Sequence, residues 1–235
     1  MLSKICTNPT SGLLLIDKPQ DFSSHDIIAI ARRVLGVKKI GHSGTLDPMA
    51  TGLLILLVGR EATKQQARFL TLGKVYEATL TLGQETDSWD ACGNVIAESQ
   101  VPPLTQTQVE KAAQALSGEV EQPIPFFSAK KVGGQKLYSL ARAGKEIERQ
   151  YNRVCVSWEN VRLADEKTIT FTLHGSCGTY VRSLGYMLAK KLGTVGHLTQ
   201  LRRLEIGPYQ VASAFDGAKL KQAHADELFA RILPI

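Results

Sequence analysis

Short apolar runs along the chain predict buried strands. The runs at residues 13–16 and 53–58 contain no polar residue, which is typical of strands covered on both faces. Residues 74–82 instead alternate, with Tyr76, Ala78, Leu80 and Leu82 on one side, which predicts a strand with one buried face. Further strands are predicted at residues 126–132, 154–163, 168–174 and 198–206.

Helical periodicity and end signals predict helices between these strands. Ser23 or Ser24 can cap a helix whose apolar face includes Ile27 and Ala31, and Gly36 ends it. Other helices are predicted at residues 61–70, 107–116, 137–143, 180–192 and 226–231, and a polar loop is predicted at 83–93. The strands recur without regular strand–helix alternation. We therefore expect an α+β fold with a central, mostly antiparallel mixed sheet flanked by helices and loops.

Composition narrows the class of protein. The 235 residues are 43% hydrophobic and 21% charged, as in ordinary globular proteins. A net charge of +6 suits a polyanionic partner, while only 6% aromatic residues argue against a row of base-stacking platforms. The apolar runs are too short to span a membrane and no secretory signal is present, so we expect a cytoplasmic protein. The four cysteines and five histidines show no metal-ligand spacing, so no metal is expected.

The most informative stretch is the glycine-rich segment 39–52, KIGHSGTLDPMATG. Its glycines allow backbone conformations that side chains would block, and Pro48 disfavours helical angles at Asp47. Asp47 is therefore predicted to lie on a constrained loop beside a strand, where it could act as a nucleophile or a general base. An ordinary Asp-Pro turn is the alternative.

Segment 39–52 resembles the catalytic motif of the TruB family of pseudouridine synthases, which act on the uridine at tRNA position 55. The resemblance implies that Asp47 is the nucleophile and that His42 enters the RNA T-loop beside the flipped base. Segment 14–26 resembles the family's first motif, which implies that Lys18 and Pro19 pack under the catalytic loop. Asp21 stands where the family usually has glycine, and aspartate tolerates the left-handed conformation that this turn needs.

Three later segments match the family in the same order. Segment 74–77 resembles the motif whose tyrosine, here Tyr76, would stack on the target base. Segment 178–183 implies that Tyr180 lines the uracil pocket and that Arg182, in the first turn of a helix, pairs with Asp47 in a forked geometry. Segment 198–204 implies that Leu201 packs on the target nucleotide. The roles of several neighbouring charged residues stay open: Asp87 and Asp90 are loop-ordering acids or solvated turn residues, and Arg202 and Arg203 pair with RNA or within the protein.

A basic segment resembles the family's RNA-gripping insertion, at approximately residues 123–151. We expect Lys130, Lys131 and Arg142 to contact RNA phosphates, and the alternative is a solvated basic face. Phe127 stands where the family often has tyrosine.

The resemblance implies one catalytic domain over residues 1–235, with no cofactor, no metal and no C-terminal PUA domain. About thirty residues follow Ile206, too few for such a domain. We expect a monomer that binds the T-arm of tRNA and isomerises uridine 55. Two rival hypotheses are a non-catalytic RNA-binding or tRNA-folding factor on the same scaffold, and a related synthase that acts on other RNAs or with guide RNAs.

Overall fold

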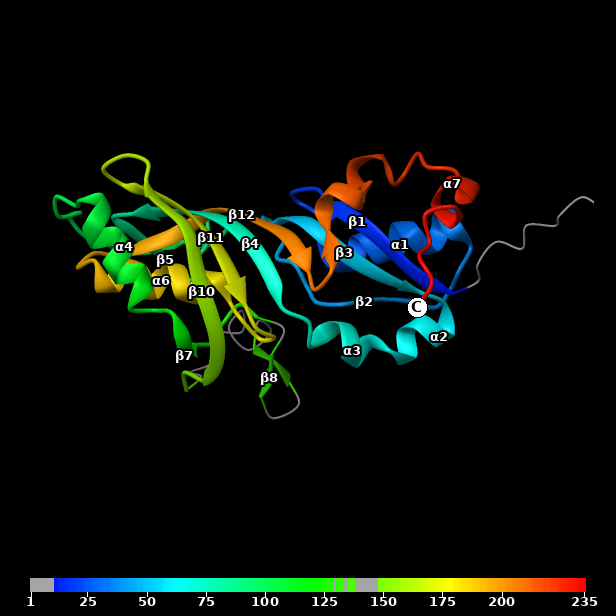
Figure 1. Ribbon diagram of the computed structural model, residues 1–235, viewed down its shortest axis with the longest axis horizontal. Helices are drawn as coiled ribbons and strands as arrows, with labels where there is room; N and C mark the ends of the chain where they lie inside the picture. Colours follow the sequence, from blue (N-terminus) through cyan, green and yellow to red (C-terminus); the bar gives the residue numbers. More distant parts are fainter. Residues whose placement is uncertain (1–10, 129, 133–134, 138–147) are drawn as a thin grey trace, which may run out of the picture. The chain divides into compact units, whose positions relative to one another are not determined.

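A computed structural model describes residues 11–128, 130–132, 135–137 and 148–235 (Figure 1). The chain divides into two compact units. The first unit consists of Met1–Leu72 and Arg203–Ile235, and the second unit consists of Gly73–Arg202.

The first unit is built on the antiparallel pair β1 and β3. Strand β1 (Gly12–Lys18) pairs with β3 (Thr51–Val58) along its whole length, from Gly12 opposite Val58 to Lys18 opposite Gly52. Strand β2 (Ile40–His42) pairs antiparallel with β3, and β14 (Phe215–Asp216) pairs parallel with β1. Strand β13 (Tyr209–Gln210) pairs antiparallel with the end of β12 (Gly196–Ile206). Its helices are α1 (Ser24–Leu35), α2 (Gly59–Lys64), α3 (Gln66–Leu70), α7 (Ala225–Phe229) and the 3-10 helices η1 (Val211–Ser213) and η2 (Gly217–Lys219).

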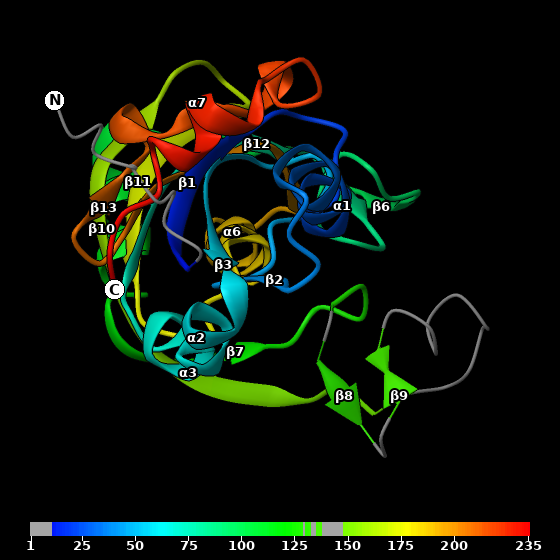
Figure 2. The same cartoon turned by 90° about the vertical axis from the view of Figure 1, so that its right-hand side faces the viewer.

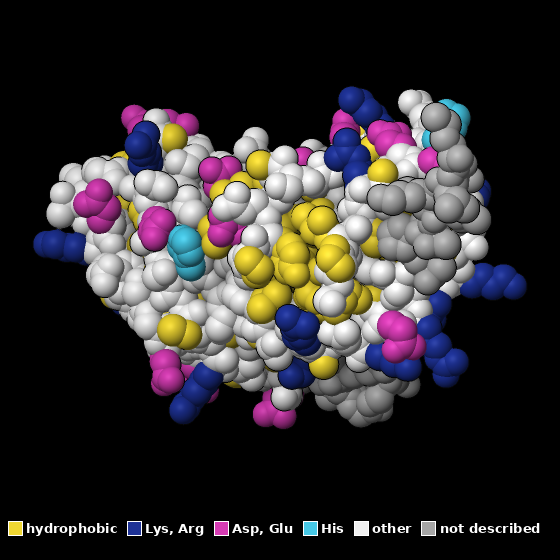
Figure 3. All heavy atoms as spheres, turned by 45° about the vertical axis from the view of Figure 1, so that its right-hand side comes forward, with side chains coloured by type: hydrophobic (Ala, Val, Ile, Leu, Met, Phe, Trp, Pro, Cys, Tyr) yellow, Lys and Arg dark blue, Asp and Glu magenta, His cyan; other side chains and the backbone are white. Residues whose placement is uncertain are grey.

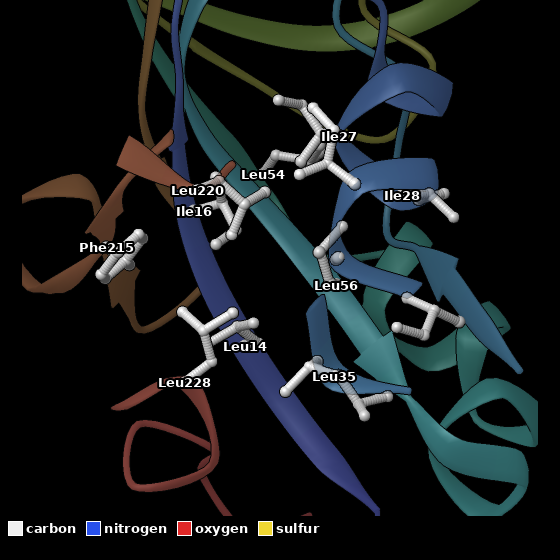
Figure 4. Packing of buried hydrophobic residues seen from close by; sticks show 14 of the residues in the cluster. Leu14, Ile16, Ile27, Ile28, Leu35, Leu54, Leu56, Phe215, Leu220 and Leu228 are labelled. Carbon is white, nitrogen blue, oxygen red and sulfur yellow. The ribbon is translucent and has the colours of Figure 1, made fainter. Parts of the chain in front are cut away.

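Apolar side chains cover both faces of this strand pair. On one face, Leu14 and Leu54 join a cluster with Ile27 of α1 and with Leu220 and Leu228 from the C-terminal segment (Figure 4). On the other face, alternate strand residues join a second cluster with Phe69 of α3. This two-sided burial explains why both strands read as continuous apolar runs.

The ends of α1 form where the sequence predicts them. Ser23 is the N-cap, and its hydroxyl oxygen accepts a hydrogen bond from the Asp26 backbone N–H at 3.1 Å, while the Asp26 carboxylate accepts from the Ser23 N–H at 2.8 Å. This reciprocal pair satisfies two donors that the helix itself leaves without partners. Gly36 follows the helix with a φ of 66°, and Asp21 in the preceding turn also has a left-handed φ of 65°, as expected.

The second unit contains an antiparallel sheet in the order β12, β4, β11, β10, β7. Strands β4 (Lys74–Leu82), β11 (Thr168–Gly175), β10 (Tyr151–Leu163) and β7 (Gly118–Pro123) pair with their neighbours in antiparallel register. Helix α4 (Gln106–Gln114) packs against β10, and α6 (Val181–Lys191) packs against β4 and β7. Two hairpins lie outside this sheet: β5 (Gln84–Thr86) with β6 (Val95–Glu98), and β8 (Lys131–Val132) with β9 (Gln135–Lys136) (Figure 2).

The fold is α+β with a mixed, mostly antiparallel sheet, so this prediction is confirmed. The alternation in β4 is also confirmed, since Tyr76, Ala78, Leu80 and Leu82 are buried. Among the helices of the described ranges, none has the length and apolar content needed to cross a bilayer.

Three local predictions were wrong. The helix predicted at 61–70 is two helices, because the chain leaves helical geometry at Gln65 (φ −90°, ψ 9°). The loop predicted at 83–93 begins in β5, because Gln84–Thr86 pairs with Val95–Glu98. Of the described residues in the strand predicted at 126–132, only Lys131–Val132 forms a strand, because residues 126–128 bend and the Phe127 carbonyl accepts from a side chain instead of a strand. Most of the helix predicted at 137–143 lies outside the described residues.

Candidate active site

The loop that carries Asp47 connects β2 to β3 in the first unit and is anchored on both sides of that residue. Before Asp47, the buried Ser24 hydroxyl accepts from the Leu46 N–H at 2.9 Å and lies 3.3 Å from the Leu46 carbonyl oxygen. After it, the Pro48 carbonyl accepts from the Asp21 N–H at 2.9 Å. These bonds join the loop to the turn and helix that follow β1. The partly buried Asp47 carboxylate is therefore carried by a backbone that is fixed immediately before and after it.

Lys18 lies under this loop as a fully buried cation. Its side chain is 0% exposed, and Nζ donates to the carbonyls of Pro19 at 2.8 Å, Phe22 at 2.7 Å and Pro48 at 3.3 Å. Burial lowers the pKa of Lys18 from its ordinary 10.5 to about 8, and the Asp47 carboxylate opposes this shift. Lys18 therefore places a positive charge against the loop at neutral pH.

His42 lies at the end of β2 in a defined orientation. Its Nδ1 accepts from the Gly44 N–H at 3.1 Å, so the neutral ring carries its proton on Nε2. The ring of His25 meets it edge to face, with centroids 5.7 Å apart. Burial, with the nearby charges of His25 and Arg203, lowers the pKa of His42 from 6.5 to about 4. The imidazole is therefore neutral at physiological pH.

Arg203 is a structural residue of the first unit. It is 1% exposed, and its guanidinium donates to the carbonyls of Leu53 at 2.7 Å and Gly44 at 3.2 Å. Of the two roles that the sequence left open for this arginine, the structure shows the pairing within the protein. The neighbouring Arg202 is partly exposed.

Arg182, in the first turn of α6, is held by two backbone carbonyls and one carboxylate of the second unit. It is 3% exposed, with Nη1 donating to the Ser88 carbonyl at 2.7 Å and Nη2 donating to the Phe127 carbonyl at 2.9 Å. Nη1 also lies 3.4 Å from a carboxylate oxygen of Asp90. A buried arginine keeps its charge, so these oxygens fix the position of a permanent cation.

Asp90 is a buried loop-ordering acid, not a solvated turn residue. It is 5% exposed and accepts from the Ser88 hydroxyl at 2.7 Å and from the Cys92 N–H at 3.0 Å. The partly buried Asp87 accepts from the Asn94 N–H at 3.0 Å and so closes the same hairpin turn.

Tyr180 is placed by a residue that the sequence reasoning missed. The buried Gln122 of β7 accepts from the Tyr180 N–H at 3.1 Å and donates to the Gly178 carbonyl at 2.7 Å. It thereby fixes the segment just before α6. No local sequence signal distinguishes this glutamine from others. The side chains of Tyr76 and Leu201 are both buried in this unit.

The site residues predicted from the sequence thus belong to both units. Lys18, Pro19, His42 and Asp47 lie in the first unit, and Tyr76, Asp90, Tyr180, Arg182 and Leu201 lie in the second. The pairing of Asp47 with Arg182 joins residues of different units and stays a prediction.

The predicted phosphate contacts are described only in part. Lys130 is exposed, the side chain of Lys131 is not among those described, and Arg142 lies outside the described residues. On the face seen in Figure 3, Lys and Arg side chains are interspersed with Asp and Glu. Within the described ranges, no three His, Cys, Asp or Glu side chains gather as a metal site requires.

Two solved structures share the fold. A Cbf5–Nop10–Gar1 complex matches 96% of this chain and 60% of its own with a TM-score of 0.71 at 22% identity. An archaeal box H/ACA Nop10–Cbf5 complex matches 97% of this chain and 60% of its own, with a TM-score of 0.69 at 21% identity. At these identities the likeness concerns the fold alone.

Sequence relatives define the class of protein as a pseudouridylate synthase. The profile of the TruB family pseudouridylate synthase N-terminal domain matches residues 32–181. Proteins named tRNA pseudouridine synthase B are 42% identical in Opitutus terrae (95% of this chain, 92% of the relative) and 41% identical in Chlamydia abortus (92% of each). The relative of that name in Psychrobacter cryohalolentis is 40% identical, over 96% of this chain and 64% of its own length. The chain belongs to the TruB family.

Proposed function

We propose that this chain is a tRNA pseudouridine synthase, an isomerase that converts the T-loop uridine at tRNA position 55 to pseudouridine. Relatives named for this enzyme share about two identical residues in five with this chain over nearly its whole length. The structural observation that carries the proposal is the placement of Asp47, on a loop anchored by Ser24 and by the buried Lys18. A loop fixed in this way can hold one carboxylate in a reactive geometry.

The reaction rearranges one bond. The N1–C1′ glycosidic bond breaks, the uracil turns and C5 bonds to C1′. C5 then releases its proton and N1 takes up a proton, so the product is an isomer of the substrate. Electrons balance without an oxidant, and we propose that no cofactor is used. Asp47 acts as the nucleophile, by addition to C1′ or to C6, or it assists a glycal intermediate.

Before this reaction, the target base leaves the folded T-loop, at a cost of a few kcal/mol. His42 enters the loop beside the flipped base. Its neutral ring suits this role, because a flat uncharged imidazole can occupy the space between bases without bringing a buried charge, and Nε2–H stays available as a donor.

The second unit supplies the groups that hold the base and orient the nucleophile. Tyr76, Tyr180 and Leu201 retain the uracil while it turns. Arg182, fixed by Asp90 and two backbone carbonyls, pairs with Asp47 and orients its carboxylate. The function therefore needs both units, which we propose act as one catalytic domain.

The partner is the T-arm of tRNA, bound by a monomer in the cytoplasm, where tRNA is found. Exposed Lys130, with Lys131 and Arg142, contacts phosphates of the T-arm. Such contacts make affinity fall as salt rises.

The test is turnover on a defined substrate. Catalytic amounts of the protein are incubated with an unmodified tRNA transcript that carries tritium at uridine C5, and released tritium is counted. The proposal expects release approaching one tritium per tRNA. A matched transcript that carries cytidine at position 55 should release none. Clear tRNA binding without any release would replace the proposal with a non-catalytic RNA-binding factor.

A further inference from the structure

A chain of ring contacts runs through the second unit beside Arg182. The Trp89 ring stacks on Tyr186 of α6, with centroids 4.4 Å apart and planes 15° from parallel. The Arg149 guanidinium carbon lies 4.6 Å from the centroid of Trp89 and 3.6 Å from that of Phe126. Both distances are within the range of cation–π attraction. Arg149 therefore connects two aromatic side chains from separate segments.

Two rings in this chain are sequence neighbours of groups that hold Arg182, and the third lies on the same helix as Arg182. Trp89 lies between Ser88, whose carbonyl accepts from Arg182, and Asp90, its ion-pair partner. Phe126 precedes Phe127, whose carbonyl is the third acceptor. Tyr186 lies one turn beyond Arg182 on α6, so it faces the same side of that helix. The ring contacts and the polar contacts thus connect the same three segments, which are residues 88–90, residues 126–127 and helix α6.

Arg149 is the member that joins two of these segments. Its Nη1 lies 3.5 Å from the Ile124 carbonyl, and the Ile124 N–H donates to the carbonyl of the next residue, Gln150, at 2.8 Å. The backbone beside Arg149 is therefore tied to the segment that leads from β7 to Phe126. Trp89 needs such support, because its φ of 59° is unusual for a bulky residue and is held only by its surroundings.

We propose that Arg149 is a positioning residue, which acts through Trp89 and Phe126 on the carbonyl and carboxylate oxygens that hold Arg182. This inference rests on the proposed function, in which Arg182 orients the nucleophile. Arg149 touches neither the substrate nor the reacting atoms in this role. Its loss moves the acceptors of Arg182, and a small displacement of an orienting group lowers the rate of the chemical step.

The test compares Arg149→Met, which keeps length without charge, with Arg149→Lys, which keeps a cation over the rings. Arg162→Met is the matched control, since Arg162 is an exposed arginine on β10, the strand that begins just after Arg149. Single-turnover rates are measured with enzyme in excess over tritiated tRNA, and tRNA affinity is measured by filter binding. Arg149→Met should lower the rate by about tenfold or more while affinity changes by less than about threefold, and Arg149→Lys should recover much of the rate.

A second comparison tests the route through Phe126. In a Phe126→Leu background, the further effect of Arg149→Met on the rate should be much smaller than in the wild type, because residues that act through each other are not additive. Equal effects in both backgrounds would overturn the inference, as would an Arg149→Met rate equal to that of Arg162→Met. Thermal unfolding of each variant shows that rates are compared between folded proteins. Absence of turnover in the wild type would instead refute the proposed function.

Discussion

Gly52, at the start of β3, is a position where one methyl group should measurably destabilise the protein. Its φ is +101°, and a Cβ added there would lie 2.2 Å from the Arg203 carbonyl oxygen and 2.7 Å from the Arg203 nitrogen. Both atoms belong to backbone, which cannot rotate out of the way as a side chain can. Gly52→Ala must therefore displace β3, the strand that follows the Asp47 loop, from the backbone of Arg203.

The magnitude follows from two effects. A positive φ costs an L-residue roughly 1–2 kcal/mol. The overlap with the Arg203 backbone adds about 1–3 kcal/mol, as in overfilled cores. Gly52→Ala should thus reduce the free energy of unfolding by about 2–5 kcal/mol.

Gly36→Ala is a control for the first effect alone. Gly36 has a φ of +66°, and no atom lies within 4 Å of its added Cβ. Alanine also reduces the entropy of the unfolded chain by a similar amount at both positions, so this contribution cancels. The assay is urea unfolding of both variants and the wild type, followed by circular dichroism. If the two variants lose the same stability, the close approach of β3 to Arg203 is wrong.

Three further predictions concern the Asp47 loop and its supports. The pKa of His42 in the folded protein, about 4, is below its ordinary 6.5, so between these pH values the unfolded chain binds one more proton and the free energy of unfolding should fall as pH decreases. Urea unfolding of His42→Gln should show a smaller fall, and an equal fall would contradict the burial of the imidazole. The pKa of Lys18 is lowered from 10.5 to about 8 in the folded protein, so between these pH values the unfolded chain binds more protons and the free energy of unfolding should rise with pH. An equal rise in the Lys18→Met variant would exclude a buried amine. Ser24→Ala leaves the Leu46 N–H without its partner and should cost about 1–3 kcal/mol in urea unfolding; unchanged stability would show that this bond does not anchor the loop.

The elements that the sequence predicted well are those whose signals are local. Helix α1 combines an apolar face with a capping serine and a terminal glycine, all within one segment, and the structure places its ends at these residues. The alternation from 74 to 82 likewise reports directly on which side of β4 is buried. The Asp47 loop could be singled out because glycines, proline and one acid occur together in fourteen residues.

What the sequence could not show depends on contacts between distant segments. Lys18 and Arg203 are long charged residues that usually lie at the surface, yet both are buried because carbonyl groups from other segments surround their charges. The ring contacts of Arg149 join three separate segments, and no spacing in the chain indicates them. The hairpin that starts at Gln84 was missed because β5 is only three polar residues long and β6 is only four residues long, too short to show a clear alternation of apolar and polar positions.

The central claim is that Asp47 performs the chemistry, and Asp47→Asn tests it most directly. Asparagine keeps the size of the side chain and removes its charge, so the loop and the RNA-binding surface should be retained. We predict that this variant binds unmodified tRNA with nearly the affinity of the wild type but releases no tritium from uridine C5, even with enzyme in excess. Pseudouridine formation at position 55 at the wild-type rate would contradict the account.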